Sequence, residues 1–200
     1  TAGTLAHPDA WRALVRRLDG SALEASLRRE CAQVGALAFV TERLPAFLTW
    51  LGQAWHDGDI AIHQEHFASS HVRAVLDSTW RELAPNVPPS AVCASLPGEQ
   101  HDLGVLMAAV VLAASGKRPL VLPGATPLDE IVACRDVTGA SLVAISLSAH
   151  SERLDVANMV AGLRTALGKD CRLVLGGVGA TGIDLDGVEV HDDLMALART

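Results

Sequence analysis

Four short runs of apolar residues, each separated from the next by a helical stretch, dominate the second half of the chain. The runs are SAVCASLP, PLVLPG, SLVAISLS and RLVLGGVG, and VEVHD is a candidate for a fifth. Helices are expected between them over residues 102–115, 126–138 and 152–168. Nearly continuous apolar strands that alternate with helices are typical of a parallel sheet covered on both faces. We therefore expect a flavodoxin-like, doubly wound α/β domain over residues 91–200.

The first half of the chain, residues 7–84, has the periodicity of a helical bundle instead. Apolar residues between Leu44 and Trp55 recur at helical spacing, and the sequence Asp57-Gly58-Asp59 then ends that helix. A further helix is expected from this turn to about Leu83. The predicted architecture is a bundle of four or five helices. Three prolines lie within APNVPPS, so residues 85–90 are the expected linker.

Two helix starts can be read from capping residues in this half. Ser21 with Glu24 three residues later matches a capping box. Asp59 is expected to cap the helix that follows the turn. His63 and His71 lie on that helix and are interpreted as surface residues, while His7, His150 and His191 receive no role.

Charge and hydropathy exclude several functions for this chain. The net charge is −7, with scattered Lys and Arg, so the chain alone lacks the basic face that phosphate contacts with DNA need. The longest apolar run is about half of a ~20-residue membrane span, and no signal peptide opens the chain. The four cysteines form no C-x-x-C pair. We expect a cytoplasmic protein without membrane contact, and its first residue, Thr rather than Met, favours removal of an N-terminal part.

Polar and glycine residues gather where the predicted strands end. Ligands of such folds bind at the carboxyl ends of the strands. A loop histidine can bind a metal, an acidic residue nearby can orient its other nitrogen, and paired glycines admit a bulky ligand. The candidates are Glu99, Gln100, His101, Asp102 and Gly104 after the first strand, Ser146 and Ser148 after the third, and Gly176 and Gly177 after the fourth.

A rival interpretation comes from residues 177–182, which match the dinucleotide-binding pattern G-x-G-x-x-G. That fingerprint belongs after the first strand and must open a helix. Here it follows the fourth predicted strand and leads into IDLDG, which is not helical.

The spacing of the strand-end residues resembles the cobalamin-binding pattern D-x-H-x-x-G, S-x-L and G-G. In this chain 41 residues separate Gly104 from Ser146, and 27 separate Ser148 from Gly176. Glu99 stands where the family has Asp, and Ser148 stands where it has Leu. The resemblance implies that His101 is the lower axial cobalt ligand and Glu99 its orienting partner. It implies further cofactor contacts from Gln100, Asp102, Gly104, Ser146, Ser148, Gly176 and Gly177, the Ser146 and Gly-Gly positions lining the pocket for the nucleotide tail.

The helical half carries a second resemblance. Trp55, nine residues and then Glu65-His66 are similar to the W-x9-E-H motif of the CarH/LitR cobalamin photoreceptors. The resemblance implies that the bundle caps adenosylcobalamin, with Trp55 and Glu65 against the adenosyl group. It also implies that His56 binds cobalt after light breaks the cobalt–carbon bond, with His66 as the alternative. Without the cobalamin-binding spacing in the second half, Trp55 would be interpreted as a core residue of the bundle. Glu65 and His66 would then belong to a solvent-exposed helix face. We expect an apolar, buried surrounding for His56.

These resemblances predict a light-sensing regulatory domain with adenosylcobalamin as chromophore, and not an enzyme. Such a domain would be a homo-oligomer whose assembly changes with light. It would control transcription through a DNA-binding domain absent from this chain. Two alternatives stay open: a corrinoid methyl-carrier protein of a methyltransferase system, and a cobalamin sensor indifferent to light. The predicted Trp55–Glu65 cap argues against the first, because a methyl carrier needs open access to cobalt, and His56 argues against the second.

Overall fold

The structure, a computed structural model, describes residues 8–153 and 155–200. It divides into two compact units, one up to Thr79 and one from Trp80 onward. The helix α5 (Ile62–Leu83) begins in the first unit and ends in the second. Residues 85–90, the expected linker, contain no regular helix or strand. Residue 7, where we expected the helical region to begin, lies outside the described residues.

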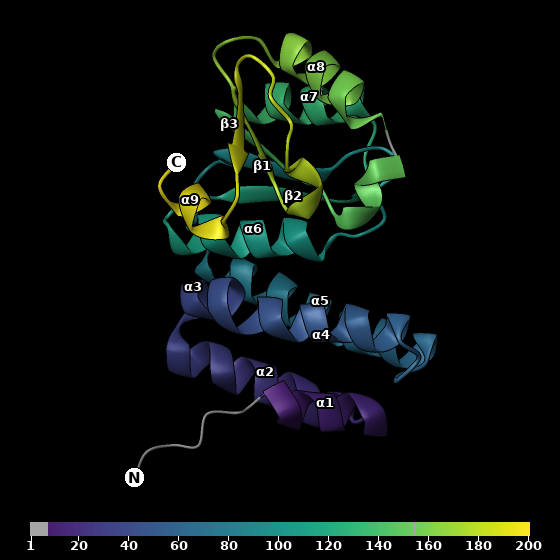
Figure 1. Cartoon of the computed structure of the whole chain (residues 1–200). Coiled ribbons are helices and arrows are strands. Elements are labelled where there is room, and N and C mark those ends of the chain that lie inside the picture. The colour runs from purple at the N-terminus through teal and green to yellow at the C-terminus, as the bar shows by residue number, and fades with distance from the viewer. Residues whose placement is uncertain (1–7, 154) are drawn as a thin grey trace. The chain divides into compact units, whose positions relative to one another are not determined.

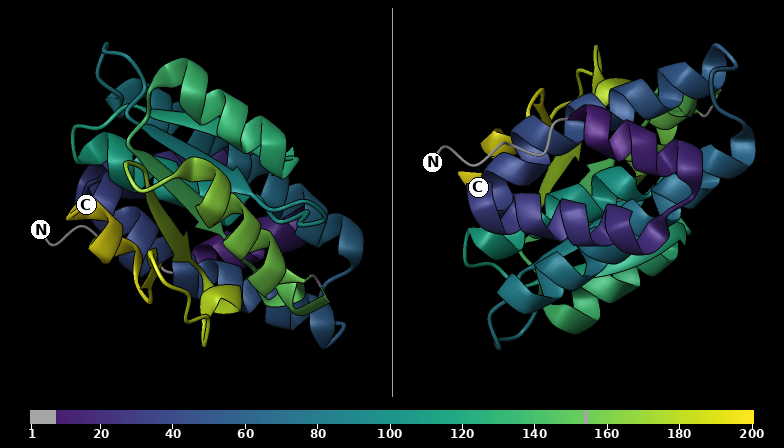
Figure 2. Two further views of the ribbon diagram at one scale, coloured as in Figure 1. Left: turned by 90° about the horizontal axis from the view of Figure 1, so that it is seen from above. Right: turned by 90° about the horizontal axis from the view of Figure 1, so that it is seen from below.

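The first unit is helical, as predicted. Its described elements are α1 (Pro8–Arg17), α2 (Gly20–Val34), the short α3 (Ala36–Ala38), the π-helical turn η1 (Phe39–Arg43), α4 (Leu44–His56) and most of α5. The ribbons of α1 and α2 lie side by side (Figure 2, right). Trp11 anchors the core, because its ring meets Phe39 and Phe47 edge-on and its Nε1 donates a hydrogen bond to Ser26 at 3.0 Å.

The start of α2 differs from the expected capping box. Asp19 is the N-cap, and its side chain accepts a hydrogen bond from the amide of Ala22 at 3.1 Å. Glu24 turns instead to His71 on α5, with 2.7 Å between Oε1 and Nδ1. The His71 ring also fills the space beside Gly20, where a Cβ would overlap it. The interpretation of His71 as a surface residue was therefore wrong.

The start of α5 also differs from its prediction. The Gln64 side chain accepts a hydrogen bond from the Ala61 amide at 2.9 Å, which is the capping contact that the structure gives this helix. The amide of Asp59 belongs to the preceding turn, where it donates to the Ala54 carbonyl at 2.8 Å. The side-chain carbonyl oxygen of Gln64, the third residue of α5, thus takes the place of the expected Asp59 carboxylate as the capping acceptor.

The second unit is a five-stranded sheet in the order β2-β1-β3-β4-β5, with every neighbouring pair parallel. This is the flavodoxin-like order, so the predicted fold class is confirmed. The helices α7 and α8 cover one face of the sheet, and α6 and α9 cover the other (Figure 1). The elements are β1 (Ala91–Ser95), α6 (Leu103–Ala114), β2 (Pro119–Ala125), α7 (Leu128–Thr138), β3 (Leu142–Ser146), α8 (Val156–Leu167), β4 (Arg172–Gly176), β5 (Val188–His191) and α9 (Leu194–Ala198).

Alternation along the strands decides which residues face which helices. Val92, Ala94 and Leu96 belong to the core cluster that contains Ile131 of α7 and Leu163 of α8. Successive side chains of a strand point to opposite faces, so the residues between them face α6. Helix α6 is apolar on all sides, and its residues 105–113 are all buried, as expected for a helix without a polar stripe.

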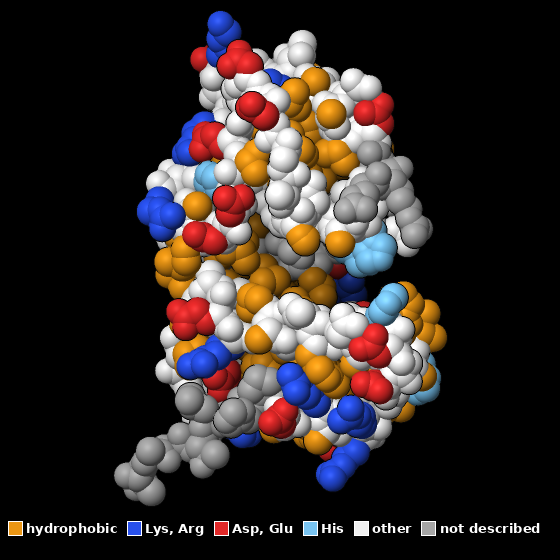
Figure 3. Space-filling view, in the orientation of Figure 1, with side chains coloured by type: hydrophobic (Ala, Val, Ile, Leu, Met, Phe, Trp, Pro, Cys, Tyr) orange, Lys and Arg blue, Asp and Glu red, His pale blue; other side chains and the backbone are white. Residues whose placement is uncertain are grey.

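The surface shown in Figure 3 mixes acidic and basic side chains without a continuous basic area on that face. All four cysteines are free thiols. Burial raises the pKa of Cys93 to about 12, so this thiol is a core residue rather than a nucleophile. In the described parts of the chain, no helix combines the length and the apolar character that a membrane crossing requires.

Candidate functional site at the carboxyl ends of β1 and β3

The crossover connections of the sheet diverge between β1 and β3. The chain leaves β1 toward β2 on one side, whereas β3 pairs with β1 on the other side. Such a switch point leaves a crevice outside the carboxyl ends of the two strands, where ligands of this fold class bind. The loop after β1 carries Glu99 and His101, and the loop after β3 carries Ser148, His150 and Ser151.

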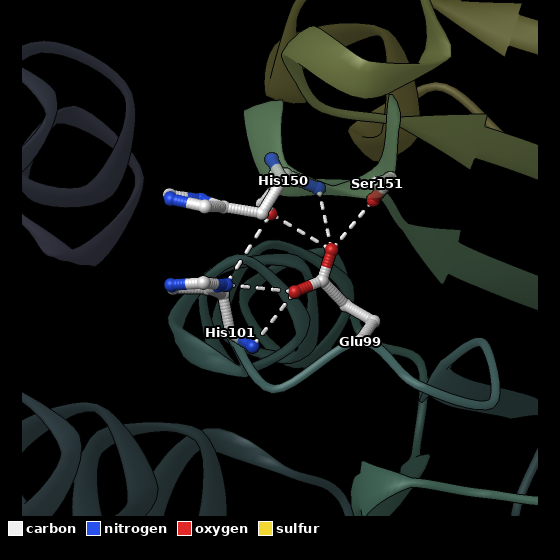
Figure 4. Close-up of polar contacts among 5 residues, drawn as sticks. Glu99, His101, His150 and Ser151 are labelled. Carbon is white, nitrogen blue, oxygen red and sulfur yellow. Dashed lines mark hydrogen bonds and ion pairs between the residues drawn. The ribbon is translucent and has the colours of Figure 1, made fainter. Parts of the chain in front are cut away.

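Glu99 joins these two loops. Its side chain is buried, and one oxygen, Oε1, accepts hydrogen bonds from the backbone amide of His101 at 2.9 Å and from its Nδ1 at 2.8 Å. The other oxygen, Oε2, accepts from Ser148 Oγ at 2.8 Å, the Ser148 amide at 3.2 Å and Ser151 Oγ at 2.5 Å. Figure 4 shows the carboxylate between the two loops. Glu99 thus holds the loop after β1 and the loop after β3 to one carboxylate.

These hydrogen bonds control the ionisation of Glu99. Burial alone would raise the pKa of this carboxyl group. The donors on Ser151, the His101 backbone, Ser148 and the His101 ring outweigh that effect and lower the pKa to about 2. Glu99 is therefore an anion at neutral pH, and an anion accepts hydrogen bonds without donating any.

The Glu99 carboxylate also decides which nitrogen of His101 can bind a metal. An acceptor at Nδ1 holds the proton there, so Nε2 carries the free lone pair. The side chain of His101 is 54% exposed. Among the described residues there is no cluster of three or more His, Cys, Asp or Glu side chains that could hold a bare metal ion. His101 is thus suited to give one ligand to a metal that brings its others along.

Two neighbours of His101 were not predicted from the sequence. The ring of His150 stacks on the His101 ring, with 4.4 Å between centroids and an interplanar angle of 18°. Ser151 is buried and makes the 2.5 Å hydrogen bond to Glu99. Both lie in the 3-10 turn η2 (Ala149–Arg153). Their signal in the sequence was the run of polar residues SAHSER directly after the third strand, of which only Ser148 was used.

A second group of candidate residues lines the carboxyl edge of the sheet. Ser95, Ser146, Gly176 and His191 end β1, β3, β4 and β5, and they pair in register across the sheet. By strand alternation all four face the side of α6. Within the described residues, Ser95 Oγ and His191 Nδ1 are buried polar atoms that find no hydrogen-bond partner. Buried polar groups are usually paired, so this row suits a polar ligand that would satisfy them.

Three glycines, Gly104, Gly176 and Gly177, lie beside this row of residues at the carboxyl edge of the sheet. A Cβ on Gly104 would overlap Ser146 Oγ, so the start of α6 lies directly against β3. Gly177 has a φ of +93°, and a Cβ there would overlap the carbonyl oxygen of Leu147. At Gly176 the nearest atom to a Cβ is 3.9 Å away. The backbone conformation and the Leu147 carbonyl require a glycine at position 177, and Gly104 leaves space for the Ser146 hydroxyl. At Gly176 the missing side chain leaves room.

Gln100, Asp102 and the glycine-rich residues 177–182 complete the set of strand-end candidates. Gln100 is exposed, and Asp102 occupies the N-cap position of α6, where its carbonyl accepts from the Leu106 amide at 3.1 Å. Residues 177–182, the rival dinucleotide motif, contain the one-turn 3-10 helix η3 (Val178–Ala180) and open no α-helix. The motif therefore lacks the context that dinucleotide binding needs.

The candidate residues of the first unit lie around the turn between α4 and α5. Trp55 is 44% exposed, which excludes its interpretation as core. Glu65 accepts a hydrogen bond from Ser69 Oγ at 2.6 Å, and its other oxygen lies 3.6 Å from His66 Nε2. His56, the last residue of α4, is exposed, so the expected buried surrounding was wrong. The cofactor contacts assigned to Trp55, His56, Glu65 and His66 stay predictions.

The sequence was compared with protein-family models and with known proteins. No protein-family model matches the sequence. The chain is 27% identical to the HTH-type transcriptional repressor CarH of Myxococcus xanthus over 178 residues, which cover 87% of this chain and 60% of that protein. The chain therefore spans less than two thirds of the length of this relative.

Two solved structures are also similar. The monomethylamine corrinoid protein of Methanosarcina barkeri aligns with a TM-score of 0.71 at 16% identity, covering 95% of this chain and 94% of that one. A cobalamin-binding protein of Desulfitobacterium hafniense aligns with a TM-score of 0.45 at 18% identity, covering 96% of each chain. The first of these likenesses shows that the chain shares the fold of a corrinoid protein.

Proposed function

We propose that this chain is a cobalamin-binding regulatory domain that senses light with adenosylcobalamin. The observation that carries the cobalamin part is the fixed imidazole of His101, whose Nδ1 is held by an anionic Glu99 while Nε2 stays free as a ligand. A corrinoid would bring nitrogen ligands of its own to cobalt, so the protein would need to supply only one further ligand, and His101 would provide it. A single, oriented histidine at a topological switch point fits that need.

The carboxyl edge of the sheet fits the nucleotide tail of such a cofactor. Ser95 Oγ and His191 Nδ1 offer unpaired polar atoms at two ends of the row, and Ser146 lies between them. Gly176 has open space where other residues have a side chain. We assign Ser146, Gly176 and Gly177 to the tail pocket, with Ser148 supporting Glu99 rather than touching the tail, since its Oγ already bonds that carboxylate.

The regulatory part of the proposal rests on the first unit and on the relative. When bound, adenosylcobalamin supplies a cobalt–carbon bond that visible light can break. Trp55 presents an exposed indole, and Glu65 a side chain that is 25% exposed, for contact with an adenosyl group. His56 is exposed and followed by Gly58 with a φ of +78°, a turn that can act as a hinge. The similarity to a transcriptional repressor favours a role in regulation, through a DNA-binding domain and a change of oligomeric state.

A methyl-carrying corrinoid protein is the second candidate, because the chain shares the fold of the monomethylamine corrinoid protein. A methyl carrier and a light sensor differ in how they treat the face of the cofactor opposite His101. A methyl carrier presents its cobalt to a partner enzyme, whereas a light sensor encloses the adenosyl group. Selectivity between the adenosyl and methyl forms of the cofactor therefore separates them.

The decisive experiment is an absorption spectrum of the purified chain with adenosylcobalamin, before and after green light, alongside size-exclusion chromatography. We expect a spectrum typical of cobalamin without its own base on cobalt in the dark, a permanent spectral change after light, and a change of assembly. His101→Ala should lose the dark spectrum. Binding of methylcobalamin and adenosylcobalamin with equal affinity, and no light response, would establish the carrier instead.

A further inference from the structure

The stacked pair of imidazoles at the site goes beyond what ligation by His101 requires. The rings of His101 and His150 lie 4.4 Å apart between centroids and within 18° of parallel. Figure 4 shows the His150 ring covering one face of the His101 ring, with both rings extending in the same direction away from Glu99. We propose that His150 is a positioning residue that fixes the plane of the His101 imidazole through this stack. The inference rests on the proposed function, in which His101 binds cobalt.

Glu99 constrains His101 only at one edge. Its Oε1 holds the backbone amide of His101 and the ring Nδ1, so the near end of the imidazole is fixed in place. A single hydrogen bond at Nδ1 still permits the ring to tilt about the line between the two atoms, because hydrogen bonds tolerate a range of angles. Contact across the face of the ring removes that freedom, and His150 provides it.

The same network that holds His101 also holds His150. The backbone amide of His150 donates to Ser148 Oγ at 3.1 Å, and Ser148 Oγ in turn bonds Glu99 Oε2 at 2.8 Å. The next residue, Ser151, donates to the same oxygen. One carboxylate therefore fixes both imidazoles, one through its own ring nitrogen and the other through the turn that carries it. The two loops that present the stacked rings are therefore held to the same carboxylate.

The geometry of the pair argues against His101 and His150 both binding the same metal ion. Imidazoles that bind one ion converge on it with their lone pairs, whereas parallel rings at stacking distance direct their outer nitrogens side by side. His150 thus acts on cobalt through His101, by limiting how the ligating ring tilts.

The first test concerns the stack itself, in protein without cofactor. In nuclear magnetic resonance spectra the ring protons of His101 should be shifted upfield by the face of His150. His150→Ala should remove that shift, and His150→Phe, which restores an aromatic face without nitrogen, should keep it. His63→Ala, at an exposed histidine of the first unit, is the control. A His101 shift unaffected by His150→Ala would overturn the proposal.

The second test uses a cobalt(II) corrinoid that lacks the nucleotide tail, so that any axial nitrogen comes from the protein. With 15N-labelled histidine, electron paramagnetic resonance of wild type should show one histidine nitrogen on cobalt, lost in His101→Ala. His150→Ala should keep that nitrogen but broaden its hyperfine lines, and weaken binding about two- to tenfold, as expected for loss of an aromatic pair. His150→Phe should restore both properties.

The outcomes separate the two claims. If His101→Ala abolishes the nitrogen signal while His150→Ala matches wild type in linewidth and affinity, the inference fails and the proposed function stands. If His150→Phe behaves like His150→Ala although its ring still shifts His101, stacking is not the cause, and the inference is wrong. If wild type itself shows no histidine nitrogen on cobalt, the proposed function is wrong, and the inference that rests on it is wrong as well.

Discussion

Glu99 and Ser151 are 52 residues apart in the chain, yet Ser151 Oγ donates a 2.5 Å hydrogen bond to Glu99 Oε2. The other oxygen of the same carboxylate holds His101. The position of the His101 ring is therefore set from two loops that follow two different strands. Tests of the site can address each side of this carboxylate separately.

Glu99→Gln should weaken binding of cobalamin by about 10- to 100-fold, the usual effect of losing the partner of a metal-binding histidine. A glutamine has one acceptor oxygen, so it cannot accept from His101 on one side and from the Ser148 amide on the other. Titration followed by absorbance measures the affinity. Glu130→Gln, on the exposed side of α7, is the control. An affinity within twofold of wild type would show that Glu99 does not orient His101.

Unfolding of the cofactor-free chain should depend on pH through Glu99. The pKa is lowered from 4.5 to about 2 in the folded state, so the stabilisation is complete above pH 4.5 and is lost as pH falls toward 2. The shift corresponds to on the order of 3 kcal/mol. Urea unfolding at several pH values should show wild type and Glu99→Gln furthest apart above pH 5 and converging at lower pH. A difference that does not change with pH would contradict the assignment.

Trp55→Ala should abolish the preference for adenosylcobalamin over methylcobalamin while leaving the fold intact. The indole is 44% exposed, so its removal costs little packing and changes the free energy of unfolding by about 1 kcal/mol or less. Competition binding of the two cofactor forms checks the preference. Val137→Ala, at a position 88% exposed on α7, serves as the matched control. Retained preference in Trp55→Ala would remove Trp55 from the adenosyl contact.

Two neighbouring glycines should respond differently to alanine. Gly177→Ala should destabilise the fold by about 1–3 kcal/mol, because its φ is +93° and a Cβ overlaps Leu147. Gly176→Ala should leave thermal stability nearly unchanged and weaken binding of complete cobalamin. A corrinoid without a nucleotide tail should still bind Gly176→Ala normally. Equal loss of affinity for both corrinoids would place the tail elsewhere.

His56→Ala should alter only the illuminated state. In the proposed dark state the adenosyl group would be bound to cobalt, and the exposed imidazole would have no metal to bind. After light, a tethered imidazole has the advantage of high effective concentration over water. We expect wild type to show a spectrum with two histidine ligands and His56→Ala a spectrum with water on cobalt. If His66→Ala rather than His56→Ala gives the water spectrum, His66 is the ligand.

The order of strands and helices in the second unit could be predicted from the sequence. Strands that are buried on both faces of the sheet appear as continuous runs of apolar residues. The runs around Val92, Val143 and Leu173 are apolar throughout, and β1, β3 and β4 lie where these runs are. His101 and Glu99 were also accessible, since a two-residue spacing on one loop suffices to bring the backbone amide, the ring and the carboxylate together.

Contacts between distant segments were not accessible in this way. His71 meets Glu24 across 47 residues, and His150 meets His101 across 49, so no local pattern announces either pair. The capping box failed for a different reason. Asp19 caps α2 two residues ahead of Ser21, the residue at which the capping box was expected to begin. Solvent exposure of His56 depends on how the end of α4 emerges from the bundle, which periodicity alone does not fix.

The double attachment of Glu99 has a consequence for protein engineering. A designer who moves only the segment Glu99–His101 onto another sheet would transplant half of the support for the carboxylate, because Ser148 and Ser151 come from the turn after β3. Without those donors, Glu99 would keep only its hydrogen bonds from His101, so burial would be opposed by fewer donors and the pKa of the carboxyl group would be higher. The smallest transferable cassette is therefore a pair of adjacent parallel strands together with both of their outgoing loops.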